Sequence, residues 1–406
     1  MLVKRHITED CFGVQLADSD PEIISKAAVL LANELNIDFI DLNSGCPIDL
    51  VTNYGAGSAL MNREKKLYEM LKLITEKTKG EVPVGVKMRK GWNSNKPNAH
   101  KLCCKIQSWT SYLKFGGAIE YVAVHGRSRQ QRYTKLCDWD YIYKTCARIS
   151  GRHCLDIRKA SKLSASSIAE ERMQPLKVFG NGDILSYLDW EQHLTATRNW
   201  FEELDQLEKE DEMRALTRAK DSLEIFSQKS PETPAKITED NLKAMKLDLN
   251  SKLTTCILAR GVLTKPWLCQ EIKEKRHLDI SSNERLDMLK KYVDYELLHW
   301  GSDRKGVNNT RRFLLEWMSF LYRYIPVGII DTQYIPQKIN DRPPRFQGRN
   351  KLETLMGSPS VQDWIKVSEM LLGPVEEGFM FTPKHKANAY EMPTQEVVKL
   401  FQPQPS

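Results

Sequence analysis

The feature that most constrains this chain is a regular alternation of short β-rich runs with helical stretches over its first two-thirds. Six runs predict strands: Phe12–Leu16, Phe39–Asn43, Val82–Met88, Tyr121–Val124, Lys177–Phe179 and Cys256–Ala259. Strand–helix alternation of this kind predicts a parallel sheet covered by helices. Polar and glycine residues gather directly after the strands, and in a (β/α) barrel that carboxyl rim carries the chemistry. The sequence therefore predicts an α/β fold whose functional side chains follow its strands.

The last part of the chain has a different pattern, in which apolar residues recur at helical spacing. Two stripes show it: Leu286, Leu289, Val293, Leu297 and Trp300, then Phe313, Leu314, Trp317, Leu321 and Tyr324. No convincing strand follows, so residues 280–406 are predicted to form an all-α domain after an α/β domain of residues 1–279. Two polar or charged segments, at 148–175 and 198–250, are predicted to be surface insertions in the first domain.

Composition excludes several classes of protein. The 406 residues contain no run approaching 18 apolar residues, and the first residues have no apolar core of a secretory signal, so we expect no membrane span. The nine cysteines have no zinc-binding spacing, so we expect no metal in this chain and a reducing compartment, cytoplasmic and/or nuclear. The net charge of +7 permits a polyanionic partner without requiring one.

Three side chains on the predicted strands and loops are candidates for chemistry. Cys46 follows a strand, where a thiol acts as a nucleophile or proton donor, although most free cysteines are buried and inert. Lys87 lies inside an apolar strand, so it either meets an anion or carbonyl or extends to the surface. His125 ends a strand, where a purely structural histidine is equally compatible with the pattern.

Two glycine-containing turns follow the last two predicted strands. They are Asn181-Gly182-Asp183 and Ala259-Arg260-Gly261, and barrels bind phosphate at this position through backbone N–H groups. Each turn alone is common. Their order after the cysteine, lysine and histidine, with Gln15 on the first strand, is the layout of a barrel that binds flavin mononucleotide (FMN).

Longer motifs extend this pattern to a known family. They are Asp41-Leu42-Asn43-Ser44-Gly45-Cys46-Pro47-Ile48-Asp49-Leu50-Val51, Ala59-Leu60-Met61, Val86-Lys87-Met88-Arg89, residues 125–135 from His125-Gly126-Arg127 to Tyr133-Thr134-Lys135, and residues 179–186. In this order they resemble the tRNA-dihydrouridine synthases, most closely the eukaryotic type-3 branch. Lys265-Pro266-Trp267-Leu268, residues 299–303, residues 310–317 and residues 371–375 are similar to the helical part of that branch. Only the two insertions fall outside the resemblance.

The resemblance implies an FMN enzyme that reduces the C5=C6 bond of a tRNA uridine, at position 47 in this branch, with NADPH as the reductant. Cys46 matches the proton donor. The residues that match cofactor contacts are Gln15, Asn43, Lys87 and His125 at the ring and Asn181, Gly182, Asp183, Ala259 and Arg260 at the ribityl chain and phosphate. Arg127 and Arg129 are assigned to the substrate RNA.

The chain departs from the family pattern at its start. The family barrel begins two βα units before the first strand matched here, so the expected fold is a TIM (β/α)8-type flavin barrel that lacks those two units. The paired Cys/His zinc fingers of the type-3 branch are also absent from the sequence.

A binding module is the alternative to an enzyme: a catalytically impaired tRNA-binding fragment or relic. Basic residues near an aromatic favour RNA contacts, and Lys338, Arg342, Arg345, Arg349 and Lys351 lie close to Phe346. We assign Arg342, Arg345 and Arg349 to RNA binding. A flavin barrel for a small molecule, such as a dihydroorotate dehydrogenase, is a weaker third reading because it has no use for the helical domain.

Overall fold

The protein is described here from a computed structural model, which defines residues 3–110, 113–150, 176–197, 199, 253–330 and 343–384. The predicted insertions at 148–175 and 198–250 lie almost wholly outside these ranges. Contacts divide the chain into two compact units. The first unit comprises residues 1–182 and 191–257, and the second comprises residues 183–190 and 258–406.

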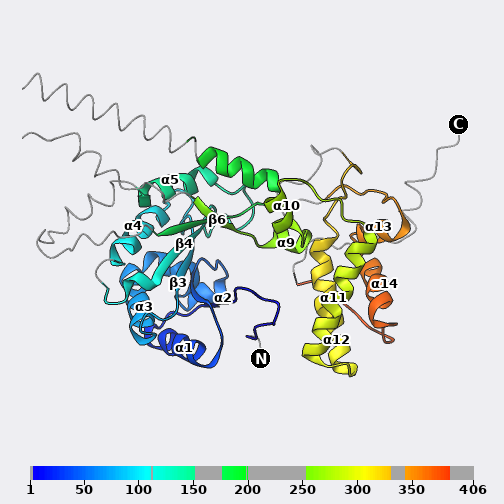
Figure 1. The fold of residues 1–406 in the computed structure, drawn as a ribbon, viewed down its shortest axis with the longest axis horizontal. Helices are drawn as coiled ribbons and strands as arrows, with labels where there is room; N and C mark the ends of the chain where they lie inside the picture. Colours follow the sequence, from blue (N-terminus) through cyan, green and yellow to red (C-terminus); the bar gives the residue numbers. More distant parts are fainter. Residues whose placement is uncertain are drawn as a thin grey trace, which may run out of the picture. The chain divides into compact units, whose positions relative to one another are not determined.

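The first unit is built on a curled parallel sheet whose strands follow one another in chain order (Figure 1). The strands are β1 (Gly13–Leu16), β2 (Phe39–Ser44), β3 (Val84–Arg89), β4 (Ile119–His125), β5 (Lys177–Asn181) and β6 (Leu253–Ile257). All six predicted strands are thus confirmed, with shifts of a few residues at their ends. The largest shift is in β6, which stops before Ala259 because that residue leaves the extended region (φ −128°, ψ −102°).

Helices cover one side of this sheet (Figure 1). They are α1 (Pro21–Glu34), α3 (Glu64–Lys77), α4 (Ala99–Trp109) and α5 (Trp139–Ser150), while the shorter α2 (Asp49–Asn53), η1 (Gly57–Asn62) and η2 (Gly116–Ala118) lie in the connections. Helix α1 begins where Asp20 accepts hydrogen bonds from the backbone of Glu22 and Ile23, with Pro21 at the first helical position. Its side chains Ile24 and Ala28 are buried.

The two faces of the sheet differ because successive side chains on a strand alternate. The helix-covered face is aliphatic and buried: Ile40, Leu42, Val86, Met88, Val122, Val124 and Val178. The inner face carries three aromatic rings, with Tyr121 stacked on Phe179 at 4.6 Å and edge-on to Phe39 at 6.0 Å. Glycine makes this possible, since a Cβ at Gly85 would lie 1.9 Å from the Tyr121 ring. These rings form an aromatic floor beneath the carboxyl ends of the strands.

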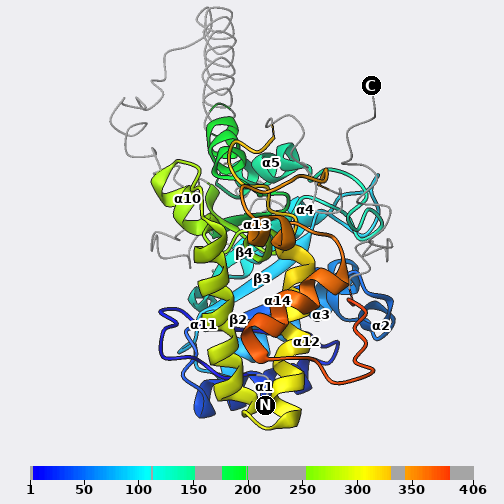
Figure 2. The ribbon, with the colours of Figure 1, turned by 90° about the vertical axis from the view of Figure 1, so that its right-hand side faces the viewer.

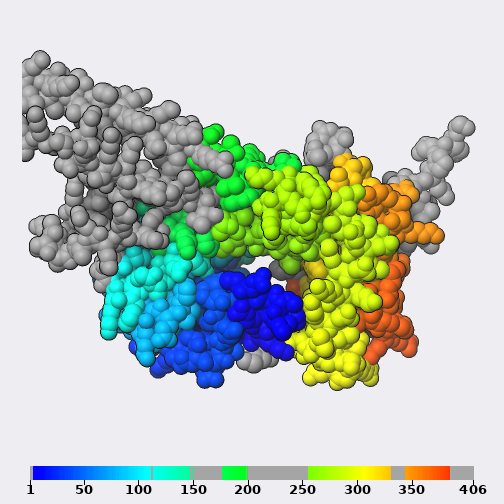
Figure 3. All heavy atoms as spheres, viewed as in Figure 1, coloured from blue at the N-terminus to red at the C-terminus, as the bar shows by residue number. Residues whose placement is uncertain are grey.

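The described residues of the second unit form helices and no strand. The helices are α9 (Arg260–Thr264), α10 (Leu268–Glu274), α11 (Ser282–Trp300), α12 (Arg304–Leu321), α13 (Lys351–Met356) and α14 (Val361–Leu372). Helices α11 and α12 run side by side with α14 packed on them (Figure 2), and their atoms form one continuous surface (Figure 3). Both long helices were predicted from their apolar stripes, and the core includes Leu289, Leu314, Leu315, Met318 and Trp364.

The longer segment of the second unit begins at Leu258, before the predicted boundary at residues 279 and 280. Helix α9 belongs to it because α9 packs on α12, where Trp317 Nε1 donates to the carbonyl of Leu263 at 2.9 Å. The division of the chain into domains of residues 1–279 and 280–406 remains a prediction.

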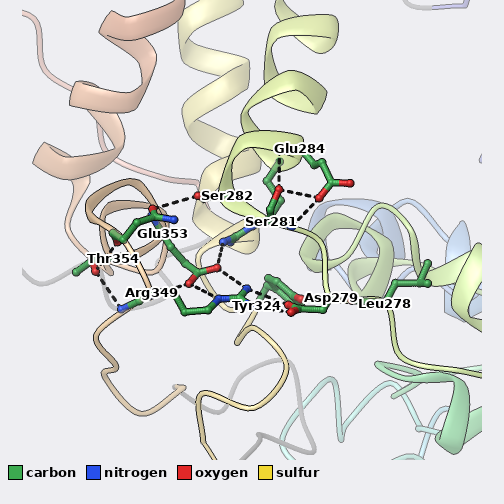
Figure 4. Close-up of polar contacts among 12 residues, drawn as sticks. Leu278, Asp279, Ser281, Ser282, Glu284, Tyr324, Arg349, Glu353 and Thr354 are labelled. Atoms are coloured by element: carbon green, nitrogen blue, oxygen red, sulfur yellow. Dashed lines mark hydrogen bonds and ion pairs between the residues drawn. The ribbon is translucent and has the colours of Figure 1, made fainter.

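A buried ion pair joins α11 to α13 in the second unit (Figure 4). Arg285 Nη2 lies 3.1 Å from Glu353 Oε1, and both side chains are 1% exposed. Arg349 donates to the same carboxylate from Nε at 3.0 Å and Nη2 at 2.9 Å, and also to Asp279 from Nη1 at 2.5 Å. The carboxylate of Glu353 therefore compensates a guanidinium that has no contact with solvent.

Replacing Glu353 by glutamine is expected to lower the free energy of unfolding by about 3–5 kcal/mol at neutral pH, because Arg285 becomes an unpaired buried charge. Hydrogen bonds from Arg349 hold the pKa of Glu353 below its ordinary value of 4.5. The stabilisation is therefore complete above that ordinary value and is lost as the pH falls through the lower pKa of the folded state. Urea unfolding across this pH range should show the wild type and the variant converging at acid pH.

The control is Glu376→Gln, which breaks an exposed bidentate pair with Arg304 in the same unit. An exposed pair contributes about 1 kcal/mol or less. Equal losses in the two variants would contradict the role given to Glu353.

Candidate active site

Parallel register brings the predicted site residues into rows at the carboxyl ends of the strands. Asn43 on β2 is the register partner of Lys87 on β3. Two residues further along β3, Arg89 pairs with His125, and His125 pairs with Asn181. Register partners share a face, and so do residues two apart on one strand. All five side chains therefore lie on the inner face, above the aromatic floor.

A chain of side-chain hydrogen bonds connects the first two strands. Gln15 Nε2 donates to Asp41 Oδ2 at 2.5 Å, and Asn43 Nδ2 donates to Gln15 Oε1 at 2.7 Å. The other oxygen of Asp41 accepts from the Tyr121 hydroxyl at 3.1 Å. Gln15 and Asn43 were predicted site residues, whereas Asp41 was quoted only as part of a motif and is the group on which both amides are oriented.

Burial shapes the electrostatics beside this chain. It raises the pKa of the Asp41 carboxyl, while the hydrogen bonds from Gln15 and Tyr121 act in the opposite direction. Burial, followed by the nearby Arg89 guanidinium, lowers the pKa of the Lys87 ammonium. Lys87 is half-buried and has no hydrogen-bond acceptor among the described residues. Of the two alternatives for Lys87, its position on the inner face favours the first, because its ammonium is available to an anion or carbonyl.

Hydrogen bonds to its backbone groups hold the loop that carries Cys46 in place. Asn43 Oδ1 accepts from the N–H groups of Gly45 at 3.0 Å and Cys46 at 2.9 Å, and the Cys46 carbonyl accepts from Ser58 N at 3.0 Å. Gly57 has φ 58°, and a Cβ there would lie 2.8 Å from the Cys46 carbonyl oxygen. Cys46 itself is half-buried rather than enclosed, so a substrate at the carboxyl edge can reach its thiol.

Arg89 is a site residue that sequence reasoning left without a role. Its guanidinium is buried and donates to three backbone carbonyls: Gly45 at 2.8 Å, Ser128 at 3.2 Å and Arg132 at 3.4 Å. It therefore ties the Cys46 loop to the loop after β4. The signal was present in the sequence, because Arg89 is two residues after Lys87 and must share its face.

The turns after β4 and β5 close around one thiol. Cys137 Sγ donates to the Asn181 carbonyl at 3.3 Å, and a Cβ at either Gly126 or Gly182 would lie 2.6 Å from the same sulfur. His125 is buried, and its Nδ1 accepts from the N–H of Arg127 at 3.2 Å. Asn181 Nδ2 donates to the carbonyl of Ile257 at the end of β6, 2.7 Å away.

The other predicted phosphate contacts belong to the second unit. Asp183 has φ 53°, in the left-handed region, and Ala259 and Arg260 stand at the start of α9. The two turns meet in this unit, because a Cβ at Gly261 would lie 2.3 Å from the carbonyl oxygen of Ile184. The predicted pairing of these two turns in space is consistent with this contact, and their phosphate role stays a prediction.

The arginines assigned to RNA differ in their surroundings. Arg127 is buried and its Nε donates to the carbonyl of Lys135 at 2.5 Å, whereas Arg129 lies over the Trp92 ring at 4.3 Å. Arg345 is exposed, and Arg349 is held by Asp279 and Glu353 as described above. Arg342 lies outside the described residues. Their contacts with RNA remain predictions.

Residues 4–157, which carry β1–β4 and the Cys46 loop, match the family model Dihydrouridine synthase (Dus). Over these residues the chain is similar to the dihydrouridine synthase family. It is 42% identical over 390 residues to "tRNA-dihydrouridine(47) synthase [NAD(P)(+)]-like" of Xenopus tropicalis, covering 96% of this chain and 47% of that protein. It is 41% identical to the protein of that name in Homo sapiens, with 96% and 46% covered.

A fungal relative extends the same likeness. The chain is 41% identical over 394 residues to "tRNA-dihydrouridine(47) synthase [NAD(P)(+)]" of Cryptococcus neoformans, covering 96% of this chain and 43% of that protein. The chain thus spans about half the length of the curated relatives it matches. The resemblance read from the motifs, including the type-3 branch, is confirmed.

Within the ranges that the structure describes, no group of three or more histidine, cysteine, aspartate or glutamate side chains is arranged to hold a metal ion. Within the same part of the chain, no helix combines the length and apolar character that crossing a bilayer requires.

Gly182→Ala is expected to destabilise the first unit, because residue 182 has φ 125° and the new Cβ would meet the Cys137 sulfur. Adding Cys137→Ala should recover the part of the loss that comes from that contact. We expect a coupling energy of about 0.5–3 kcal/mol in a double-mutant cycle of urea unfolding. Gly117→Ala is the matched control, since a Cβ at Gly117 meets nothing within 4 Å. Additive effects of the two substitutions would show that the thiol does not restrict Gly182.

Proposed function

We propose that this protein is a dihydrouridine synthase, which reduces the C5=C6 bond of a tRNA uridine to dihydrouridine, with FMN as its cofactor and NADPH as its reductant. The observation that carries the proposal is the cluster of Asn43, Lys87, His125 and Asn181 on one face, next to the half-buried thiol of Cys46. The names of the relatives support position 47 of the tRNA as the target and NAD(P)H chemistry.

The donor set fits a flavin mononucleotide. The Lys87 ammonium is half-buried without an acceptor among the described residues and suits the electron-rich pyrimidine edge of the ring. The amides of Gln15 and Asn43 are oriented by Asp41 beside it. The resemblance assigns the ribityl chain and phosphate to Gly182 and to Asp183, Ala259 and Arg260, which lie in turns of the kind whose backbone N–H groups bind phosphate. When bound, the flavin supplies a hydride for C6 of the uracil.

The protein's own residues account for the other half of the reduction. A hydride that arrives at C6 leaves negative charge at C5, and this carbon then needs a proton from a positioned acid. Cys46 is the candidate, because Asn43 and Ser58 fix its backbone while its thiol stays accessible. His125 lies one strand beyond Lys87 on the same face, and this position supports a contact with the uracil. Proton transfer from Sγ to C5 completes the saturated bond.

The fold assignments follow from the same proposal. The curled six-stranded sheet would form part of a TIM (β/α)8-type barrel, and the helical unit would hold the tRNA, in the cytoplasm or the nucleus. An open groove of about 720 Å³ at the start of α12 supports RNA binding by that unit. Its lining includes Arg304, Lys305 and Arg312, together with the carboxylates of Glu376 and Glu377.

Replacing Cys46 by alanine is expected to slow dihydrouridine formation by about 10²–10⁴-fold, the usual loss when a general acid is removed. NADPH oxidation in the absence of tRNA should be unchanged, because it needs no proton at C5. Mass spectrometry of the tRNA product and absorbance at the nicotinamide band would measure the two rates. An equal slowing of both would remove Cys46 from its role as proton donor. A wild-type chain that binds tRNA but forms no dihydrouridine with FMN and NADPH would favour the binding module.

Arg345→Gln is expected to weaken tRNA binding without loss of stability, because the exposed side chain has no carboxylate partner among the residues that the structure describes. Its salt dependence should flatten by about 0.9 per lost duplex phosphate contact, and by less in single strands. Arg349→Gln is the comparison: it should lower the unfolding midpoint, because Asp279 and Glu353 lose their partner. Binding measured across a salt series would contradict the assignment of Arg345 if its slope matched that of the wild type.

A further inference from the structure

The carboxylate of Asp49 bridges two arginines of the loop after β4. Asp49 is the first residue of α2, three residues after Cys46. Its Oδ1 lies 2.6 Å from Arg129 Nη2, and its Oδ2 lies 3.2 Å from Arg132 Nη2. The function proposed above gives Asp49 no role, and it leaves these two contacts unexplained.

The arginine side of this bridge is firmly anchored. The N–H of Arg129 donates to the Gly91 carbonyl at 2.9 Å, and that of Gln130 donates to the Trp92 carbonyl at 3.3 Å. The Arg129 guanidinium also lies over the Trp92 ring, 4.3 Å from its centroid. The loop after β4 is thus built on the loop after β3, so its guanidiniums offer fixed positive charge.

The backbone of Arg132 is strained in a way that the bridge helps to maintain. Its φ is 45°, in the left-handed region that costs a non-glycine residue roughly 1 kcal/mol or more. The Arg132 carbonyl accepts from Arg89, and its guanidinium reaches Asp49. A strained conformation persists where its surroundings hold it. Here the contacts with Arg89 and Asp49 hold the backbone and the side chain of Arg132.

We propose that Asp49 is a positioning residue, whose ion pairs with Arg129 and Arg132 hold the Cys46 loop against the loop after β4. This rests on the proposed function only in giving Cys46 its chemical role. Two kinds of contact then hold the Cys46 loop. The hydrogen bond from Arg89 to the Gly45 carbonyl is buried. The ion pairs of Asp49 are open to solvent, since the Asp49 side chain is 62% exposed and that of Arg132 is 52% exposed. Salt should therefore weaken the ion pairs of Asp49, because exposed ion pairs are screened.

The test follows alkylation of Cys46 by iodoacetamide. The tryptic peptide of residues 27–63 contains Cys46 as its only cysteine, so mass spectrometry reports this thiol alone. At about 0.02 M KCl, Asp49→Asn should be alkylated about two- to tenfold faster than the wild type, the range expected for one or two exposed ion pairs. Raising the salt to about 0.5 M should bring the wild type toward the variant, whose own rate stays constant. Asp49→Glu should restore the slow, salt-sensitive rate.

Two further variants keep the test decisive. Arg132→Gly removes one of the two guanidiniums and suits the left-handed backbone, so it should fold well and be alkylated at a rate between those of the wild type and Asp49→Asn. Glu22→Gln breaks a comparably exposed pair with Lys77 in the same unit and should leave the Cys46 rate unchanged. Wild-type rates in both Asp49→Asn and Arg132→Gly, or a wild-type salt response in Asp49→Asn, would overturn the proposal.

The same measurement separates this inference from the proposed function, since it needs no flavin and no RNA. Faster alkylation of Asp49→Asn in a chain that forms no dihydrouridine would support the positioning role of Asp49 and refute the proposed reaction. Normal dihydrouridine formation with unchanged alkylation would support the reaction and refute the positioning role.

Discussion

The parallel register of six strands is the constraint on which the candidate site depends. Strands β2 and β3 carry aliphatic side chains on one face and polar ones on the other, and a slip of one residue would send the polar set into the helix-covered face. The register pairs Asn43 with Lys87 and Arg89 with His125 and Asn181, so residues distant in sequence share one face. The glycines at positions 13 and 85 support this arrangement, because they leave room for the rings of Phe39 and Tyr121 beneath the polar groups.

Burial on that face gives its charged groups unequal tasks. The Arg89 guanidinium donates hydrogen bonds to backbone carbonyls and so has a structural role. Lys87, two residues earlier, has no such acceptor among the described residues and is left for a ligand. Asp41 is buried and accepts hydrogen bonds from Gln15 and Tyr121, so its carboxylate orients both side chains. One basic residue thus organises the loops while its neighbour remains open to chemistry.

Sequence patterns located the strands, because period-two alternation and polar strand ends are local signals. The six strands and both long helices were predicted in this way. The contact of Cys137 with Gly182 could not be predicted, since it joins residues 45 positions apart in sequence and depends on how two turns meet. The ion pair of Arg349 could not be predicted for the same reason, because its partner Asp279 lies 70 residues away.

The hydrogen-bond chain from Asp41 through Gln15 to Asn43 has a direction. The carboxylate only accepts, so Gln15 must turn its NH₂ toward Asp41 and its oxygen toward Asn43. Asn43 must then turn its own oxygen toward the N–H groups of Gly45 and Cys46. The buried carboxylate of Asp41 therefore sets the orientation of both amides. Through them it also sets the position of Asn43 Oδ1, the acceptor that shapes the Cys46 loop. Glutamate in place of Gln15 would differ by a single heavy atom and still break this chain at Asp41, because two carboxylates would then face each other.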